Sequence, residues 1–290
     1  MITSSLTGNL GNHMWIYAIT RAIAESNDYK WGFNPTPEYD YYGGQPQMGF
    51  MDIDYGMIHT YKYKENPLWL KHAWYESHEH TDYPNGDSVD YHPYQPEVFY
   101  IEDDTKLFIR CCQDARYLEK YKNNVKNWFH IKDDFQEIYK NQLLDQNIYL
   151  DEDTTVINVR GGEYRGISKL ILDRDYYNNA FIIAKNRNPK VKFVCVTDDM
   201  SYANSLFYGA FPIVHFSIGA DYYIINNAKN LIISNSSFAI FPTWLNENKP
   251  YVIAPRYWAR HNVSTGYWAS SDIWTFGWNF LDKDGTLYAK

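Results

Sequence analysis

Short apolar segments alternate with helical segments throughout the second half of the chain, and this alternation restricts the fold more than any other feature. Five segments have the composition of buried strands: 155–159, 192–197, 213–216, 231–234 and 251–254. The segments between them have helical spacing of apolar residues and predict helices at 175–185, 200–207, 221–228 and 236–246. Strands that alternate with helices form βαβ units, so we expect a parallel sheet with right-handed crossovers.

The first half of the chain predicts a second, less regular α/β domain. Residues 2–5 and 30–33 fit strands, and a turn at residues 8–12 leads into a helix at 14–25. Proline and glycine are dense from about residue 31 to residue 100, which indicates an irregular insertion. Residues 113–145 have helical character. With 290 residues and about 150 residues per domain, two domains follow, at 1–150 and 151–290.

Charge and composition exclude several classes of protein. The formal net charge of −8 disfavours a nucleic-acid-binding protein, which needs a basic face. No basic leader opens the chain, and no apolar run approaches the roughly 20 residues of a membrane span. Three cysteines make no disulfide framework, so we expect a cytoplasmic protein without a membrane segment. The 28 tyrosines fit sugar stacking or simply a tyrosine-rich core.

Ligands of parallel sheets bind beyond the carboxyl ends of the strands, so the turns after strands are the candidate sites. Arg160 ends a strand and enters Gly161-Gly162, where it either binds a ligand anion or pairs with Asp198 or Asp199. These two carboxylates end the next strand, and we expect them to cap a helix and orient Arg160 rather than bind metal.

Two further turns have the chemistry of an anion site. Gly8 to Asn12 precede a helix, as a plain tight turn or as an approach for an anion. Ser236 and Ser237 begin a helix after a strand, as ordinary caps or as phosphate donors. The segment His78-Glu79-His80 with Asp82 has metal-binding side chains, but it lacks zinc-site spacing and fits a solvated loop.

Several of these segments occur together in one order along the chain. Residues 8–18 have the sequence GNLGNHMWIYA, residues 112–118 CQDARYL, residues 158–164 NVRGGEY, residues 197–199 TDD and residues 235–246 NSSFAIFPTWLN, with Asp221 before the last of them. Taken in the same order, these five segments resemble five patterns: G-x-L-G-N-Q-M-F-Q-Y-A, F-Q-S-E-K-Y-F, H-x-R-R-G-D-Y, S-D-D and D-x-x-L-M…N-S-S-F-S-W-W-G-A-W-L-N. Asp221 matches the Asp that opens the last pattern. These patterns are those of glycosyltransferase family 11, the α-1,2-fucosyltransferases. The resemblance covers most of the chain outside about residues 31–100.

The resemblance implies a fold of the GT-B type, with two Rossmann-like domains facing across a donor cleft. Residues 1–150 would form the acceptor-side domain, residues 151–290 would bind the nucleotide-sugar, and the last residues would pack back on the first domain. The implied activity is inverting transfer of fucose from GDP-fucose to a glycan hydroxyl in an α-1,2 linkage. The implied partners are a nucleotide-sugar donor and a glycan acceptor, with no metal or other cofactor.

The resemblance also implies roles for particular residues. Arg160 would hold the diphosphate, Ser236 and Ser237 would bind phosphate, and Asp221 would bind the guanine base. The implied donor-binding set is Gly11, Asn12, Asn158, Arg160, Asp198, Asp221, Asn235, Ser236 and Ser237. The catalytic candidates are Arg160 for the leaving group, with Glu163 or His13 as the base. An ion pair of Glu163 with Arg160 or Arg165 is the alternative to its catalytic role.

The chain departs from the family patterns at several charged positions. The family His is Asn158, its second Arg is Gly161, its Asp is Glu163 and its Gln is His13. The lost charge leaves two other functions open. One is a related transferase that uses a different nucleotide-sugar, and the other is a glycan-binding module without catalysis.

Overall fold

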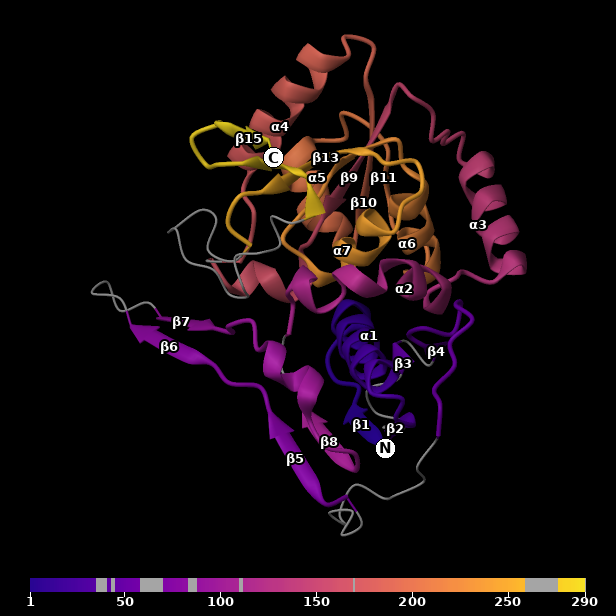
Figure 1. Cartoon of the computed structure of the whole chain (residues 1–290). Helices are drawn as coiled ribbons and strands as arrows, with labels where there is room; N and C mark the ends of the chain where they lie inside the picture. Colours follow the sequence, from indigo (N-terminus) through magenta and orange to yellow (C-terminus); the bar gives the residue numbers. More distant parts are fainter. Residues whose placement is uncertain are drawn as a thin grey trace. The chain divides into compact units, whose positions relative to one another are not determined.

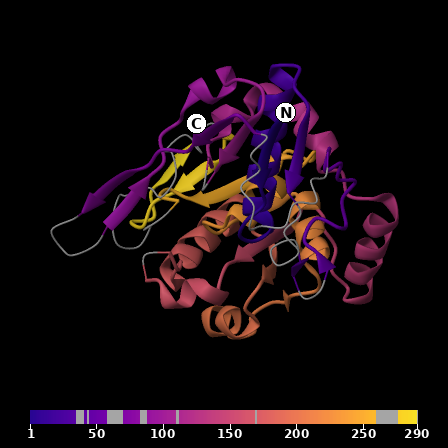
Figure 2. The same cartoon turned by 90° about the horizontal axis from the view of Figure 1, so that it is seen from below.

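The computed structural model describes residues 1–34, 41–42, 45–57, 70–82, 88–109, 112–168, 170–258 and 276–289. Its chain divides into two compact units, one formed by Met1–Lys132 and the other beginning at Asp133. This boundary lies before residue 150 because α3 (Asp133–Asp145) packs against α6 (Ile218–Asn227) of unit 2. Figures 1 and 2 both show α3 beside α6. Cys111 and part of the 31–100 insertion lie outside the described residues.

Unit 1 contains a four-stranded parallel sheet with one long helix against it (Figure 1). The strand order is β2-β1-β8-β5. The elements are β1 (Ile2–Ser5), α1 (Leu10–Ser26), β2 (Trp31–Asn34), β5 (His72–Tyr75) and β8 (Thr105–Phe108). Helix α1 packs on β1 and β2 and buries most of its residues, as its largely apolar sequence predicts.

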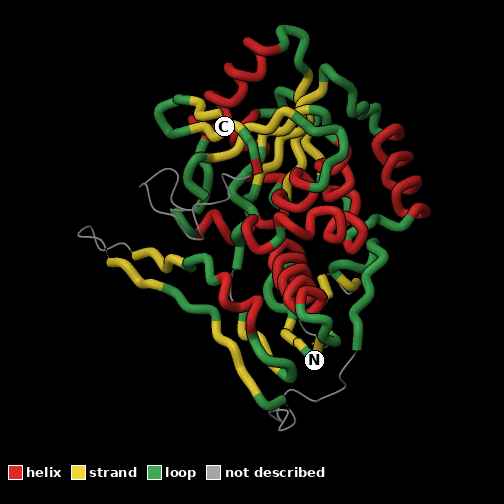
Figure 3. The backbone as a smooth tube through the Cα atoms, in the orientation of Figure 1, coloured by secondary structure: helices red, strands yellow, loops and turns green. Residues whose placement is uncertain are grey.

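The rest of unit 1 consists of hairpins and short helices. The hairpins are β3 (Tyr41–Tyr42) with β4 (Gln45–Pro46), and β6 (Glu79–Asp82) with β7 (Ser88–Tyr91). Figure 3 shows the β6–β7 hairpin continuing beyond β5. The helix predicted at 113–145 is broken into η2 (Ala115–Tyr117), η3 (Glu119–Tyr121), α2 (Lys122–Trp128) and α3. A further short helix, η1 (Pro96–Tyr100), precedes β8.

Unit 2 contains a seven-stranded sheet of order β11-β10-β9-β12-β13-β14-β15. All its neighbouring strands are parallel except β14 and β15. The strands are β9 (Thr154–Val159), β10 (Lys192–Thr197), β11 (Ile213–Val214), β12 (Asn230–Ile232), β13 (Tyr251–Pro255), β14 (Asn279–Leu281) and β15 (Leu287–Ala289). The α/β prediction is therefore confirmed, with a parallel sheet in each of two units, as the GT-B type requires.

The end of the chain extends the sheet of unit 2. Strands β14 and β15 continue this sheet beyond β13, so the backbone of β13 has hydrogen-bonding neighbours on both sides. The packing of the last residues on the first domain stays a prediction.

The helices of unit 2 begin at side-chain caps that the sequence supplies. Asp173 caps α4 (Arg174–Arg187), Asp199 caps α5 (Met200–Phe207) and Ser217 caps α6 through their side-chain oxygens. Helix α7 (Ser237–Trp244) follows β12 and has no side-chain cap. Helices α4 and α5 pack on the central strands in one buried cluster, and the strand β9 is buried along its whole length. Strands that are covered on both faces have such continuous apolar sequences.

Candidate functional site

The predicted site residues of unit 2 lie at one edge of its sheet. Strands β9, β10, β11 and β12 are mutually parallel neighbours, so their carboxyl ends meet at this edge. The strand order reverses between β9 and β12, because β10 and β11 continue to one side of β9 and β13 to the other. Such a reversal opens a crevice beyond the strand ends, where ligands of open α/β sheets bind. Arg160 follows β9 and Ser234 to Ser237 follow β12, so they flank this point.

Carboxylates hold the guanidinium of Arg160 on two sides. Its Nη1 donates a hydrogen bond to Oδ2 of Asp198, and its Nη2 donates to Oε1 of Glu163 at 2.8 Å. The guanidinium also lies over the ring of Tyr164, 5.3 Å from its centroid. Charge-assisted bonds of this kind fix the orientation of an arginine. The ion pairs that the sequence left as alternatives for Arg160 and Glu163 are therefore present. A role of either residue in catalysis stays a prediction.

Two glycines follow Arg160 because the carboxylates of Asp198 and Asp199 fill the adjoining space. A Cβ at Gly161 would lie 2.4 Å from Cβ of Asp199, and one at Gly162 would lie 2.7 Å from Oδ2 of Asp198. The Gly161 N–H donates to Oδ1 of Asp198 at 2.8 Å, and the Gly162 N–H to Oδ2 of Asp199 at 3.2 Å. Oδ1 of Asp199 accepts from the Tyr202 N–H at the start of α5. The predicted combination of a helix cap and an orienting partner for Arg160 is confirmed.

The turn after β12 places polar groups at the start of α7. Asn158 is buried in β9, and its Oδ1 accepts a hydrogen bond from the Ser234 hydroxyl at 2.6 Å. Asn235 is 2% exposed, and its Nδ2 donates to the Leu170 carbonyl at 2.8 Å. Its Oδ1 has no hydrogen-bond partner among the described residues. Ser236 is the N-cap residue of α7, but its side chain makes no capping bond, and Ser237 is the first helical residue.

Asp221 lies inside α6, buried, with both carboxylate oxygens bonded. Its Oδ2 lies 2.7 Å from Nδ1 of His215, and its Oδ1 accepts from the Phe216 N–H at 3.1 Å. Burial raises the pKa of Asp221, against the effect of its two donors. The sequence analysis placed Asp221 at the start of its helix, but the helix begins at Ile218 with Ser217 as its cap. Asp221 therefore does not cap α6.

The sequence analysis missed His215. It predicted a strand through residue 216, whereas β11 ends at Val214, so His215 is the first residue beyond a carboxyl end. The hydrogen bond to Asp221 raises the pKa of His215, and burial opposes this effect. The signal that could have identified it was a histidine at the end of a predicted strand shortly before an acidic residue.

The three predicted residues of unit 1 lie at the start of α1. Gly11 and Asn12 are helical residues, not part of the preceding turn, because α1 begins at Leu10 and only Gly8 has a positive φ of 80° there. Oδ1 of Asn12 accepts from Nε2 of Gln113 at 3.0 Å. His13 is buried, and Nε2 has no hydrogen-bond partner among the described residues. Burial lowers the pKa of His13 to about 4, so its imidazole is neutral at pH 7.

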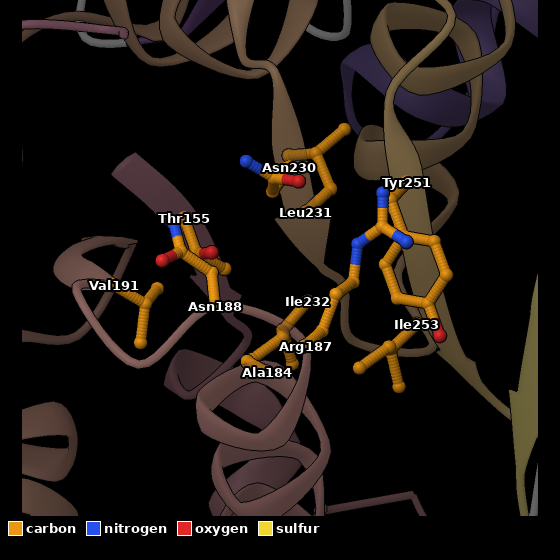
Figure 4. Close-up of a pocket in the computed structure, with 10 residues that line it drawn as sticks. All are labelled: Thr155, Ala184, Arg187, Asn188, Val191, Asn230, Leu231, Ile232, Tyr251 and Ile253. Atoms are coloured by element: carbon orange, nitrogen blue, oxygen red, sulfur yellow. The ribbon is translucent and has the colours of Figure 1, made fainter. Parts of the chain in front are cut away.

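A pocket in unit 2 lies away from these residues, at the amino-terminal edge of the sheet (Figure 4). Thr155, Asn230 and Tyr251 stand at or near the first residues of their strands and line it. The guanidinium of Arg187 lies over the Tyr251 ring, 4.0 Å from its centroid. The lining of this pocket has no carboxylate, thiol or imidazole. The candidate catalytic residues of unit 2 lie at the opposite edge of the sheet.

The described residues also bear on metals and membranes. Among them, no three His, Cys, Asp or Glu side chains gather as metal ligands. His78 and His80 are exposed, and His78 stacks on His92. Within the same described segments, no helix combines the length and the apolar character that crossing a bilayer requires.

A comparison with protein families decides the class of this chain. The profile described as "Glycosyl transferase family 11" matches residues 95–282, which is more than half of the sequence and includes the whole edge described above. The chain belongs to glycosyltransferase family 11. This confirms the family resemblance of the sequence motifs.

Individual relatives of this family 11 protein are distant. It is 25% identical over 164 residues to the O-antigen biosynthesis glycosyltransferase WbnK of Escherichia coli, covering 52% of this chain and 54% of WbnK. The chain thus spans about half the length of the curated relative that it matches.

Solved structures of fucosyltransferases are similar to this chain at a lower level. Fucosyltransferase NodZ from Bradyrhizobium has 13% identity and a TM-score of 0.49, with 84% of this chain and 92% of NodZ covered. POFUT1 in complex with GDP has 10% identity and a TM-score of 0.45, with 87% of this chain and 97% of POFUT1 covered.

Proposed function

We propose that this glycosyltransferase transfers fucose from GDP-fucose to a hydroxyl group of a glycan, with inversion at the sugar carbon and an α-1,2 linkage. One observation carries the proposal. Arg160 follows β9 and α7 follows β12, so both lie beside the point where the strand order reverses. The choice of fucose rests on the opening motif and the Asn-Ser-Ser-Phe stretch, which resemble those of α-1,2-fucosyltransferases.

The diphosphate of the donor would lie at this edge. The first amides of α7 have no partner within the helix, and a helix N-terminus favours an anion. Ser236 and Ser237 add hydroxyl groups beside these amides. The unpaired Oδ1 of Asn235 lies next to them, and a buried acceptor without a donor costs about 1–3 kcal/mol. A donor hydroxyl or amino group that reaches Oδ1 would remove this cost.

The reaction requires charge stabilisation at the leaving group and removal of one proton. The acceptor oxygen attacks the sugar carbon as the bond from that carbon to the diphosphate oxygen breaks, and the electron pair of this bond stays on GDP. Arg160 and the amides of α7 stabilise the charge that develops there. The acceptor proton passes to a base. Of the two candidates, Glu163 has an exposed carboxylate, whereas His13 is buried and burial lowers its pKa to about 4.

An assay of donors tests the proposal. The full chain is incubated with GDP-fucose, GDP-mannose or UDP-galactose and a glycan that ends in galactose, and the released nucleotide and the product mass are measured. We expect release of GDP and addition of one deoxyhexose with GDP-fucose alone. Transfer from another donor would replace fucose in the proposal. Glycan binding with no turnover of any donor would favour a binding module.

A further inference from the structure

The His215–Asp221 pair has one buried member and one accessible member. The Asp221 side chain is 6% exposed, and that of His215 is 36% exposed. Asp221 bonds to the Phe216 N–H through Oδ1 and to Nδ1 of His215 through Oδ2. Nε2 of His215 has no hydrogen-bond partner within the described part of the chain. A ligand at this edge therefore meets the His215 imidazole before it meets the carboxylate.

The surroundings of His215 favour its protonated form. Asp221 on α6 bonds to it, and Asp198 beyond β10 adds a further negative charge, although Asp198 also pairs with Arg160. From the other packed elements, Cys195 of β10 is buried with a raised pKa, and Tyr139 of α3 bonds to Ser217 with a raised pKa, so both are neutral. The hydrogen bond to Asp221 raises the pKa of His215 most.

We propose that His215 is the residue that reads the base of the donor nucleotide, by donating a hydrogen bond from Nε2 to O6 of guanine, and that Asp221 is its positioning residue. This inference rests on the proposed function, because it takes a guanine nucleotide as the donor. It changes the role of Asp221. The carboxylate orients the imidazole and does not itself take both guanine N–H groups, because its side chain is only 6% exposed and one of its oxygens is bonded to the imidazole.

The chemistry of the purines makes this arrangement selective. With Nδ1 bonded to the carboxylate, the imidazolium directs its second N–H outward. Guanine presents an acceptor, O6, where adenine presents an amino group that is a donor. With adenine, the N–H of His215 and the amino group of the base would face each other, and neither would have a hydrogen-bond acceptor. Hypoxanthine keeps O6 and N1–H but lacks the amino group of guanine, so inosine diphosphate (IDP) distinguishes a contact to O6 from a contact to the amino group.

Calorimetric titration of the full chain with GDP, IDP and ADP tests the proposal. The variants are His215→Ala, which removes the donor, and His215→Gln, which keeps a neutral N–H donor. His72→Gln is the matched control. His72 is a half-exposed histidine in unit 1 whose Nε2 lies 2.9 Å from Oε2 of Glu102. Thermal melting of each variant verifies that it is folded.

The proposal predicts a specific pattern of affinities. The native chain binds GDP and IDP within about threefold of each other and ADP at least tenfold more weakly. His215→Ala weakens GDP and IDP about tenfold and leaves ADP unchanged, while His72→Gln changes none of them. His215→Gln restores part of the GDP affinity. As pH rises through the His215 pKa, the affinity for GDP falls in the native chain and falls less in His215→Gln. The titration of the phosphate is the same in both proteins, so the difference between their pH profiles belongs to His215.

Three results would overturn the inference in distinguishable ways. If the native chain prefers GDP and His215→Ala keeps that preference, His215 does not read the base, and the proposed function stands. If IDP binds as weakly as ADP, the amino group is read, and Asp221 contacts the base directly. If the native chain has no preference for guanine nucleotides, both the inference and the GDP donor fail.

Discussion

Asp198 bonds to Arg160 through Oδ2 and to the next backbone N–H through Oδ1, so a single carboxylate fixes both the side chain and the turn after it. These bonds join the ends of β9 and β10, which are neighbours in the sheet. The cation at this edge is therefore oriented before any ligand binds. Groups that are already oriented stabilise developing charge without the cost of reorganisation.

Replacing Arg160 with alanine should remove most of the transferase activity while the chain still folds. Loss of one charge contact to the leaving group should raise the barrier by about 2.7–4 kcal/mol, or about 10²–10³ in kcat. The measurement is kcat with saturating donor, beside a thermal melt. Arg187→Ala is the control, because Arg187 lies at the opposite edge, over Tyr251. Activity within a few-fold of the native value would remove Arg160 from the reaction, and an unfolded variant would favour a purely structural pair with Asp198.

Glu163→Gln distinguishes the base from a simple ion-pair partner. If Glu163 takes the acceptor proton, kcat should fall by about 10²–10⁴, because the amide cannot accept the proton, and the acidic limb of the pH–rate profile should disappear. Its side chain is 63% exposed, so the fold should not change. A fall of less than about fivefold with an unchanged profile would leave Glu163 as the partner of Arg160 only.

Chelation should leave the activity unchanged. Both oxygens of Asp198 and both oxygens of Asp199 already accept from Arg160, from Gly161, from Gly162 and from the start of α5. These partners already compensate the charge of the two carboxylates, so we expect no cation to be required there. The test compares initial rates with and without EDTA. Loss of activity that manganese or magnesium restores would assign Asp198 and Asp199 as ligands.

The guanine preference should depend on Asp221. We expect GDP to bind more tightly than UDP or ADP. The Asp221→Ala substitution should reduce this difference in affinity, because the substitution removes the partner that orients His215. The same change should also lower the free energy of unfolding by about 1–3 kcal/mol, since the Phe216 N–H loses its acceptor. Titration of the three nucleotides and urea unfolding measure the two effects. Equal affinities in the native chain would exclude GDP-fucose as the donor.

His13 should make the fold sensitive to mild acid. Its pKa falls from 6.5 in the unfolded chain to about 4 in the folded chain, because the charged form is buried. The unfolded state therefore binds more protons between these pH values, and stability falls as pH falls through this range. The loss at pH 5.5 is about 1.4 kcal/mol relative to pH 8. His13→Gln should abolish this part of the acid sensitivity in urea unfolding at the two pH values. An unchanged pH dependence would show that His13 titrates normally.

The central strands of unit 2 followed from the sequence because they are buried, whereas β14 and β15 near the end of the chain were not predicted. Continuous apolar runs such as β9 and β10 can be assigned as strands without knowing which strands lie beside them. The bounds predicted for α5 match the observed ones. In unit 1, β5 was missed because it lies at the edge of the sheet, where exposed positions such as Tyr75 remove the apolar signal. Residues 113–145 are largely helical, as predicted, but they form four separate helices, because local periodicity does not show where a chain passes from one unit to the next.

The candidate residues that directly follow a strand could be predicted from the sequence, as Arg160 and Asp198 show. His215 could not, because its bond depends on a residue in the following helix and on the early end of β11. For Arg160, the sequence left open which of Asp198, Asp199 and Glu163 would be its partner. A sequence shows which charges are near in the chain, but the register of β9 against β10 decides which of them meet.

The close approach of Gly161 to Asp199 restricts how this sequence can evolve. The family pattern has an arginine where this chain has Gly161. A side chain at position 161 needs the turn or Asp199 to shift, because its first atom would lie 2.4 Å from Cβ of the residue that caps α5. A substitution at this glycine would therefore disturb the start of α5 as well as the turn after β9.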